Sequence, residues 1–368
     1  MTVIAAFGIN GCPIVFGDLL VTGPASAKGG KKVSVPAVGY VHEFFGASGW
    51  TVTGLHQKVT IISDNCVLAW AGSLIGARNA ISELKTIAKR KTLTCEDVLR
   101  FLRNDPELAR HPAGFVGILL EGKSIKQFKY QAEDFLSDSL GRVYLAGSGS
   151  HAVHEFSDLM SSASFRTKGE VNLVAHAFGR ALSLGGMLLQ SELGGRESAA
   201  TIMNMFGGGY EIASYYNGRV QKLDDVSYVI WDAELMDDEI RLSLPQLIVK
   251  QKYVSDFLLI RSMRTAGNDA GPVLRVIDDQ RHIIRPMFDS RLELVPHDWA
   301  NLSLESSLIC HCIIVRQKGA VLGVYTRIQQ TAPDSEKAMT FTDERDQVVL
   351  GLNTKVIKEI GASLDRFR

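Results

Sequence analysis

The chain has 368 residues, of which 46% are hydrophobic and 22% charged, so it is long enough for roughly two domains with sizeable cores. Lysine plus arginine and aspartate plus glutamate number 40 each, and this balance argues against a nucleic-acid-binding surface, which normally carries a basic excess. No apolar run reaches the about 18 residues of a membrane-spanning helix, and no signal-peptide pattern is present. The 5 cysteines lack the spacing of a disulfide framework. We therefore expect a cytoplasmic protein that has neither a membrane nor a nucleic acid as partner.

Apolar runs rich in β-branched residues predict that the first part of the chain contains many strands. Asn10-Gly11 separates the first two runs and is typical of a two-residue hairpin turn. Residues 23–57 are rich in glycine and proline and contain an aromatic cluster, which predicts a long loop or an extra hairpin. The predicted strands cover residues 2–9, 13–22, 58–71, 114–121, 125–131, 142–147, 209–216 and 219–231.

Helices are predicted where apolar residues recur every three or four positions. One such pattern runs from Ser73 to about Arg90, and Thr94 with Asp97 close behind has the pattern of an N-cap for the next helix. Two further helices are predicted over residues 150–162 and 171–191. The order of strands, two helices, strands, two helices and strands in residues 1–232 predicts an α+β fold, a four-layer αββα sandwich of two antiparallel sheets between helix pairs.

The remaining residues, 233–368, have mostly strand-like apolar runs and predict a smaller C-terminal α+β domain of unknown role. Cys310-His311-Cys312 alternates along one of its strand-like runs. No second pair of ligands is spaced to complete a zinc site, so we interpret this motif as a buried strand and expect no metal. The strand-like apolar runs cover residues 257–260, 307–315, 321–328 and 348–352.

The candidate chemistry begins at Thr2, directly behind Met1. If Met1 is removed, a hydroxyl and a free α-amino group belong to one residue, and the amine can accept the proton of the hydroxyl. The first hairpin can return Asp18 to the start of the first strand. Lys58 begins the next long strand, and Gly72 precedes a helix whose unpaired N–H groups favour negative charge.

These residues, taken in register, resemble those of the proteasome β-subunit family of N-terminal nucleophile hydrolases over about residues 2–220. The resemblance implies that Thr2 is the nucleophile, that Asp18 and Lys58 form a buried pair beside it, and that the Gly72 N–H stabilises the oxyanion. It also implies assembly into a homo-oligomeric ring and a sandwich fold of the N-terminal nucleophile type.

The resemblance extends to a turn and to a substrate pocket. It implies that Ser148, in a Gly-Ser-Gly turn, supports the nucleophile, and that Glu192 is the later acidic residue of the site. It further implies a substrate site, in which a tryptophan makes the primary pocket shallow. The residues implied for that site are Val21, Thr22, Trp70 and Leu74.

The sequence also departs from the family pattern. Leu20 stands where many active members carry a basic residue, and Gly195 replaces a serine after the acidic turn. Glu192 is one methylene longer than the usual aspartate, the 23–57 insertion lengthens a loop, and residues 233–368 have no counterpart. These differences leave the assembly and the substrate open.

Three functions are compatible with these patterns. The first is a threonine-type N-terminal hydrolase that cleaves peptide or amide bonds after removal of Met1, without a metal or organic cofactor. The second is a non-catalytic scaffold or binding subunit, which retention of Met1 would favour. The third is a small-molecule amidase whose pocket is closed by the insertion and the C-terminal domain.

Overall fold

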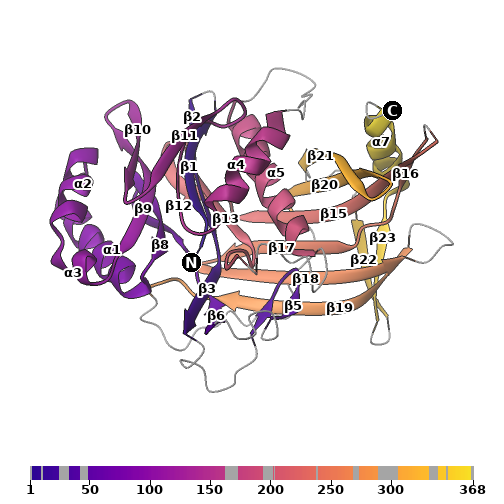
Figure 1. Ribbon diagram of the computed structural model, residues 1–368, viewed down its shortest axis with the longest axis horizontal. Coiled ribbons are helices and arrows are strands. Elements are labelled where there is room, and N and C mark those ends of the chain that lie inside the picture. The colour runs from indigo at the N-terminus through magenta and orange to yellow at the C-terminus, as the bar shows by residue number, and fades with distance from the viewer. Residues whose placement is uncertain are drawn as a thin grey trace. The chain divides into compact units, whose positions relative to one another are not determined.

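The computed structural model describes two compact units, each with its own sheets (Figure 1). Among the described residues, unit 1 ends at Leu223 and also contains Pro286–Phe288, and unit 2 begins at Asp224. The boundary thus lies earlier than residue 232, within the run predicted as a single strand. The described residues are 2–9, 11–24, 33–41, 49–161, 173–193, 202, 204–237, 239–267, 273–288, 306–330, 339–344 and 347–365.

A six-stranded antiparallel sheet in unit 1 has the order β11-β12-β1-β2-β13-β14. Its strands are β1 (Ile4–Ile9), β2 (Cys12–Asp18), β11 (Glu133–Ser137), β12 (Gly141–Ala146), β13 (Tyr210–Tyr216) and β14 (Arg219–Lys222). The predicted first hairpin is confirmed, because Ile9 pairs with Cys12 across a two-residue turn. Gly11 has a φ of 81°, as such a turn requires, whereas Asn10 lies outside the described residues.

A second antiparallel sheet in unit 1 has the order β10-β9-β8-β7. Its strands are β7 (Val59–Ser63), β8 (Cys66–Gly72), β9 (Ala113–Glu121) and β10 (Ser124–Tyr130). Alternation along β8 sends Val67 and Ala69 into a core shared with Ile4 and Val15 of the six-stranded sheet. This shared core packs the two sheets against each other.

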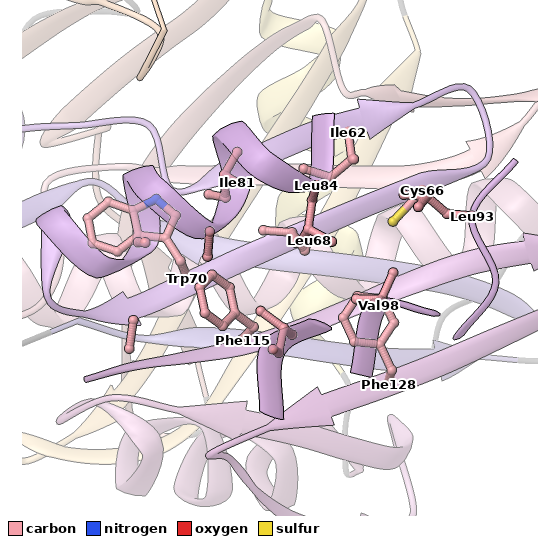
Figure 2. Close-up of a cluster of buried hydrophobic side chains, with 14 of the residues drawn as sticks. Ile62, Cys66, Leu68, Trp70, Ile81, Leu84, Leu93, Val98, Phe115 and Phe128 are labelled. Carbon is pink, nitrogen blue, oxygen red and sulfur yellow. The ribbon is translucent and has the colours of Figure 1, made fainter. Parts of the chain in front are cut away.

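The first two helices of unit 1 start at clear capping residues. Ser73 caps α1 (Leu74–Ala88), and Thr94 forms a capping box with Asp97 at the start of α2 (Cys95–Asn104), which confirms the predicted N-cap. Leu68, Trp70 and Phe115 point away from the shared core and pack against α1 and α2, as Figure 2 shows. The other helices are α3 (Pro106–Arg110), α4 (Ser150–Ser161) and α5 (Leu173–Leu193). Of these, α5 contacts β1, β2 and β13.

The described part of the 23–57 insertion forms strands. β3 (Leu20–Pro24) pairs with β6 (Trp50–Leu55), and β4 (Ser34–Val35) pairs with β5 (Gly39–Tyr40). Buried aliphatic side chains from these strands form a small core together with Ile202. The insertion therefore contains two strand pairs, one more than the single extra hairpin considered from the sequence.

Unit 2 is built on a nine-stranded sheet with the order β21-β20-β15-β17-β18-β19-β23-β22, and β16 pairs with β15. The only parallel neighbours in this sheet are β15 and β20. Cys310, His311 and Cys312 are fully buried in β20, which confirms the core-strand interpretation. The strands are β15 (Asp225–Met236), β16 (Glu239–Leu242), β17 (Leu247–Val254), β18 (Phe257–Gly267), β19 (Val273–Ile284), β20 (Leu308–Gln317), β21 (Ala320–Gln330), β22 (Met339–Glu344) and β23 (Gln347–Leu352).

One helix, α7 (Thr354–Leu364), covers part of one face of this sheet. Val356, Ile360 and Leu364 of α7 join a core with residues of β15, β17, β18 and β20. On the same face, beyond this core, Lys250 is buried and donates to the Asp225 carboxylate. The sheet therefore carries both an apolar core and a buried ion pair.

The fold class predicted from the sequence is wrong. Within the part of the chain that the structure describes, strands account for 52% and helices for 26%, in several antiparallel sheets rather than a four-layer αββα sandwich with a smaller α+β extension. The physical reason is that several strands lack a long apolar run. β16 and β19 place polar side chains between apolar ones, and β11 has only two apolar residues flanked by polar ones, so their apolar content did not reveal them.

Candidate active site

The first hairpin brings Thr2 next to Asp18. Because Ile4 pairs with Gly17, the end of β2 lies beside the residues that precede β1. The Asp18 N–H donates to the Val3 carbonyl at 3.0 Å, and the Val3 N–H donates to Asp18 Oδ1 at 3.1 Å. The Thr2 hydroxyl donates to the same carboxylate oxygen.

Lys58 completes the contact from the residue before β7. Its ammonium donates to Thr2 Oγ1, to Asp18 Oδ1 at 2.7 Å and to the Leu20 carbonyl. An ammonium has three N–H donors, and each has an acceptor here. Thr2, Asp18 and Lys58 are at most 1% exposed, so the structure gathers these three predicted residues in one buried cluster.

Burial and charge act in opposite directions on Lys58. Removal from water lowers the pKa of Lys58, while the negative charges of Asp18 and Glu211 oppose that decrease. Lys58 therefore loses its proton more readily than an exposed lysine. In its charged form it stabilises negative charge on Thr2 Oγ1, and in its neutral form it can accept the proton of that hydroxyl.

The Gly147-Ser148-Gly149 turn holds the backbone of Thr2. The Gly149 N–H donates to the Thr2 carbonyl at 3.1 Å. Gly147 has a φ of 104°, and a Cβ there would lie 2.0 Å from the Thr2 carbonyl oxygen, so only glycine allows this approach. The Ser148 hydroxyl donates to the Asn204 carbonyl at 2.8 Å, and the support predicted for the nucleophile comes from the two glycines instead.

Glu192 lies near Asp18 but is bonded to other groups. It accepts from the Tyr210 hydroxyl at 2.7 Å and from the Gly208 N–H at 3.3 Å. Burial, with a smaller contribution from the Asp18 charge, raises the pKa of Glu192 to about 8, against the effect of these two hydrogen bonds. Glu192 is thus a neighbour of the site that is linked to it through the Gly207-Gly208 turn.

That turn joins the two carboxylates and directly precedes β13. The Gly207 N–H donates to Asp18 Oδ2 at 2.8 Å, and the next N–H reaches Glu192. Gly207, Gly208 and Gly209 have φ values of 120°, 79° and 106°, which favour glycine. The run of three glycines was the available signal, because successive N–H groups in such a turn can bind anionic oxygens.

Sequence reasoning missed Glu211 entirely. It lies in β13, is 2% exposed, and its Oε2 accepts the Lys58 N–H at 2.6 Å. The available signal was an acidic residue among the apolar residues of a predicted strand, since a carboxylate in such a position needs partners.

The predicted oxyanion donor, Gly72, lies close in sequence to two predicted pocket residues, Trp70 and Leu74. In the described part of the chain none of the three is hydrogen-bonded to Thr2. Gly72 ends β8 with a φ of 95°, and no hydrogen bond joins it to Thr2 among the described residues. Trp70 is 2% exposed and its ring packs in the core under α1 (Figure 2). Leu74 packs against the same core, so both side chains belong to that core.

Val21 and Thr22 lie in β3, next to the residue that binds Lys58. The Val21 carbonyl accepts from the Thr53 hydroxyl at 3.1 Å. The Thr22 Oγ1 atom is buried and has no hydrogen-bond partner among the described residues. An unsatisfied buried polar group is costly, and of the four residues implied for the substrate site, Thr22 and Trp70, through its indole N–H, each carry one within the described part of the chain.

A scan against protein-family models finds no match for this chain, and a search of curated proteins finds no significant similarity. In the part of the chain that the structure describes, no helix combines the length and the apolar character needed to cross a membrane. The geometry around Thr2 is therefore the basis for assigning a function.

The raised pKa of Glu192 leads to a prediction for stability. A glutamate ordinarily has a pKa of 4.5, and burial raises the pKa of Glu192 to about 8 in the folded chain. Between these pH values the folded protein holds a proton that the unfolded chain has released, so stability falls as pH rises, by at most about 1.4 kcal/mol per pH unit. Glu192→Gln cannot ionise, and we expect its stability to rise relative to the wild type between pH 5 and pH 9.

Urea unfolding of both proteins at pH 5, 7 and 9 checks this expectation. Glu83→Gln, at an exposed position of α1, is the control and should follow the wild type at every pH. A difference between Glu192→Gln and the wild type that stays constant with pH would show that Glu192 is already ionised throughout this range.

Proposed function

We propose that this protein is an N-terminal threonine hydrolase that cleaves peptide or other amide bonds once the Met1–Thr2 bond has been cut. One observation carries the proposal: Thr2 Oγ1 contacts both the Asp18 carboxylate and the Lys58 ammonium. A buried carboxylate and a buried lysine on the same threonine hydroxyl orient it and place a cation beside the charge that would form on its oxygen.

The reaction would proceed through an ester. The freed Thr2 amine, which titrates near ~7.7–8.0 in model peptides, takes the hydroxyl proton as Oγ1 attacks the amide carbonyl. Lys58 stabilises the oxygen that attacks, and the Gly72 N–H is the proposed donor to the oxyanion. The amine then gives its proton to the leaving nitrogen, the C–N bond breaks, and water hydrolyses the ester to release the acid and restore Thr2.

Asp18 would hold the other two groups in place. Its Oδ1 binds both Thr2 and Lys58, and its Oδ2 accepts the Gly207 N–H at 2.8 Å. With both oxygens occupied, the carboxylate is fixed in orientation and balances the charge of the lysine. This division of roles places the nucleophile on Thr2, the cation on Lys58 and the orientation on Asp18.

Two preparations of the chain test the proposal. One begins at Thr2, produced by cleaving an N-terminal fusion directly before it, and the other retains Met1, with intact mass confirming each N-terminus. We expect the first preparation to hydrolyse fluorogenic peptides and to react with a peptide epoxyketone, which bonds to both the amine and the hydroxyl of an N-terminal threonine. The second preparation should do neither. Equal behaviour of the two preparations would contradict the proposal.

A non-catalytic binding subunit is the second candidate, and one observation favours it. Thr2 is only 1% exposed, and a nucleophile must meet its substrate. The same two preparations separate the candidates, because a binding subunit reacts with the epoxyketone in neither form. Light scattering on the preparation that begins at Thr2 measures whether it forms the homo-oligomer that the family resemblance implies.

A further inference from the structure

Glu211 holds the backbone at the residue that supplies the lysine. One carboxylate oxygen, Oε2, accepts the N–H of Lys58 at 2.6 Å and the N–H of Val59 at 3.0 Å. Glu211 belongs to the six-stranded sheet and Val59 begins the four-stranded one. These bonds therefore tie the start of β7 to the sheet that carries Thr2 and Asp18.

A second side chain reinforces the same segment. Lys222 of β14 donates to Glu211 Oε1 at 2.6 Å and to Gln57 Oε1 at 2.9 Å. Gln57 directly precedes Lys58, so contacts from β13 and β14 hold three consecutive residues. The Glu211 side chain is fully buried and that of Lys222 is 15% exposed, which makes the pair largely inaccessible to water.

Packing alone does not require a carboxylate at this position. An apolar side chain would fill the space without the cost of burying a charge. The two N–H groups and the Lys222 ammonium offset that cost only in the observed arrangement. The charge also favours the ammonium form of Lys58 against the effect of burial.

We infer that Glu211 is a positioning residue that fixes the place and the charge of Lys58 beside Thr2, an inference that rests on the proposed hydrolase function. Its oxygens fix the position of the Lys58 backbone directly before β7, and hence the position of the Lys58 ammonium. Through its charge it sets how firmly Lys58 holds its proton. Glu211 itself touches neither Thr2 nor a substrate in this arrangement.

Three variants separate position from charge. Glu211→Gln keeps an oxygen that can accept the two N–H groups but removes the charge, whereas Glu211→Ala removes both. Lys222→Met keeps Glu211 and removes the positive charge beside it. Ser214→Ala is the matched control, because Ser214 is buried in the same strand and bonds to the Pro13 carbonyl.

The titration of Lys58 is the main measurement. NMR of the lysine side-chain ¹³Cε, with the signal assigned by its loss in Lys58→Arg, follows the pKa of Lys58 directly. We expect Glu211→Gln to lower this pKa by about one unit and Lys222→Met to raise it, because the two variants remove opposite charges. If Glu211 had a merely structural role, the pKa of Lys58 would shift in the same direction in both variants or in neither. Either result would overturn the inference.

Kinetics on the preparation that begins at Thr2 provide the second measurement. We expect kcat to fall about tenfold in Glu211→Gln and about a hundredfold in Glu211→Ala, with KM unchanged, since a misplacement of about 1 Å can cost a hundredfold. Ser214→Ala should match the wild type. Wild-type kcat in both Glu211 variants would overturn the inference.

The two measurements also distinguish this inference from the proposed function. If the wild type hydrolyses nothing, the proposed function fails, and the opposite shifts of the Lys58 pKa still decide whether Glu211 sets its charge. If Glu211→Ala does not fold, Glu211→Gln and Lys222→Met carry the test. If the wild type hydrolyses its substrate and the pKa of Lys58 shifts in neither variant, the role of Glu211 is rejected and the proposed function stands.

Discussion

Thr2→Ala should lose hydrolysis of fluorogenic peptides by about 10⁴-fold or more, because it removes the group that forms the covalent intermediate in the proposed reaction. Fold and stability should change little, since Asp18 and Lys58 bond to each other directly, 2.7 Å apart in the wild type, and this contact does not pass through the hydroxyl. Steady-state kinetics on both proteins, each beginning at residue 2, measure the loss. Intact mass after incubation with the epoxyketone should show an adduct on the wild type only.

Two controls make this result specific. Thr2→Ser keeps a hydroxyl and an α-amine on the same residue and should retain measurable hydrolysis and labelling. Thr53→Ala removes a threonine hydroxyl that donates to the Val21 carbonyl at 3.1 Å rather than to Thr2, Asp18 or Lys58, and should keep full activity. Hydrolysis by Thr2→Ala at the wild-type rate would place the nucleophile elsewhere or assign the activity to a contaminant.

The closeness of Thr2 and Asp18 could be predicted because it depends on local rules. A two-residue turn at residues 10 and 11 fixes the register of the hairpin, and that register places Gly17 opposite Ile4. Lys58 is different, because no local pattern says where its ammonium points. Its role was implied by the resemblance to a family, and its contacts with Thr2 emerge only from the folded chain.

The supporting residues could not be predicted, since they act across long separations in sequence. Glu211 bonds to Val59 in the other sheet of unit 1, and Gly207 bonds to Asp18 from a turn that follows α5. Which strand lies beside which is a property of the packed sheets. The sequence shows only that a carboxylate and a glycine run are unusual at those positions.

The error in fold class has a physical cause in unit 2. The sheet of unit 2 contains both an apolar core and a buried ion pair, so some of its strands have charged residues at buried positions. Lys250 in β17 is buried in this way, because it pairs with Asp225 of the neighbouring β15. A prediction from apolar runs counts such a residue as exposed. β17 was therefore missed, although three apolar residues from Leu247 to Val249 directly precede Lys250 in it.

The pair of Asp18 and Lys58 should dominate the stability of the site whether or not the chain is an enzyme. Asp18→Asn leaves the ammonium of Lys58 buried without a counter-charge, and losing one partner of a buried pair typically costs about 3–5 kcal/mol. Lys58→Met fills the space with an apolar chain but leaves the Asp18 carboxylate buried, so it should cost a similar amount. Urea unfolding at pH 7, followed by intrinsic fluorescence and circular dichroism, measures both.

The double variant tests whether Asp18 and Lys58 neutralise each other. Asp18→Asn with Lys58→Met contains neither charge, so it should be more stable than either single variant and its cost should be well below the sum of the two. Glu96→Gln, at the exposed ion pair of Glu96 with Arg100 on α2, is the control and should change stability by less than about 1 kcal/mol. Strictly additive losses at Asp18 and Lys58 would mean that water or another group already neutralises Lys58. The cation that the proposed reaction needs beside Thr2 would then be held by something other than Asp18.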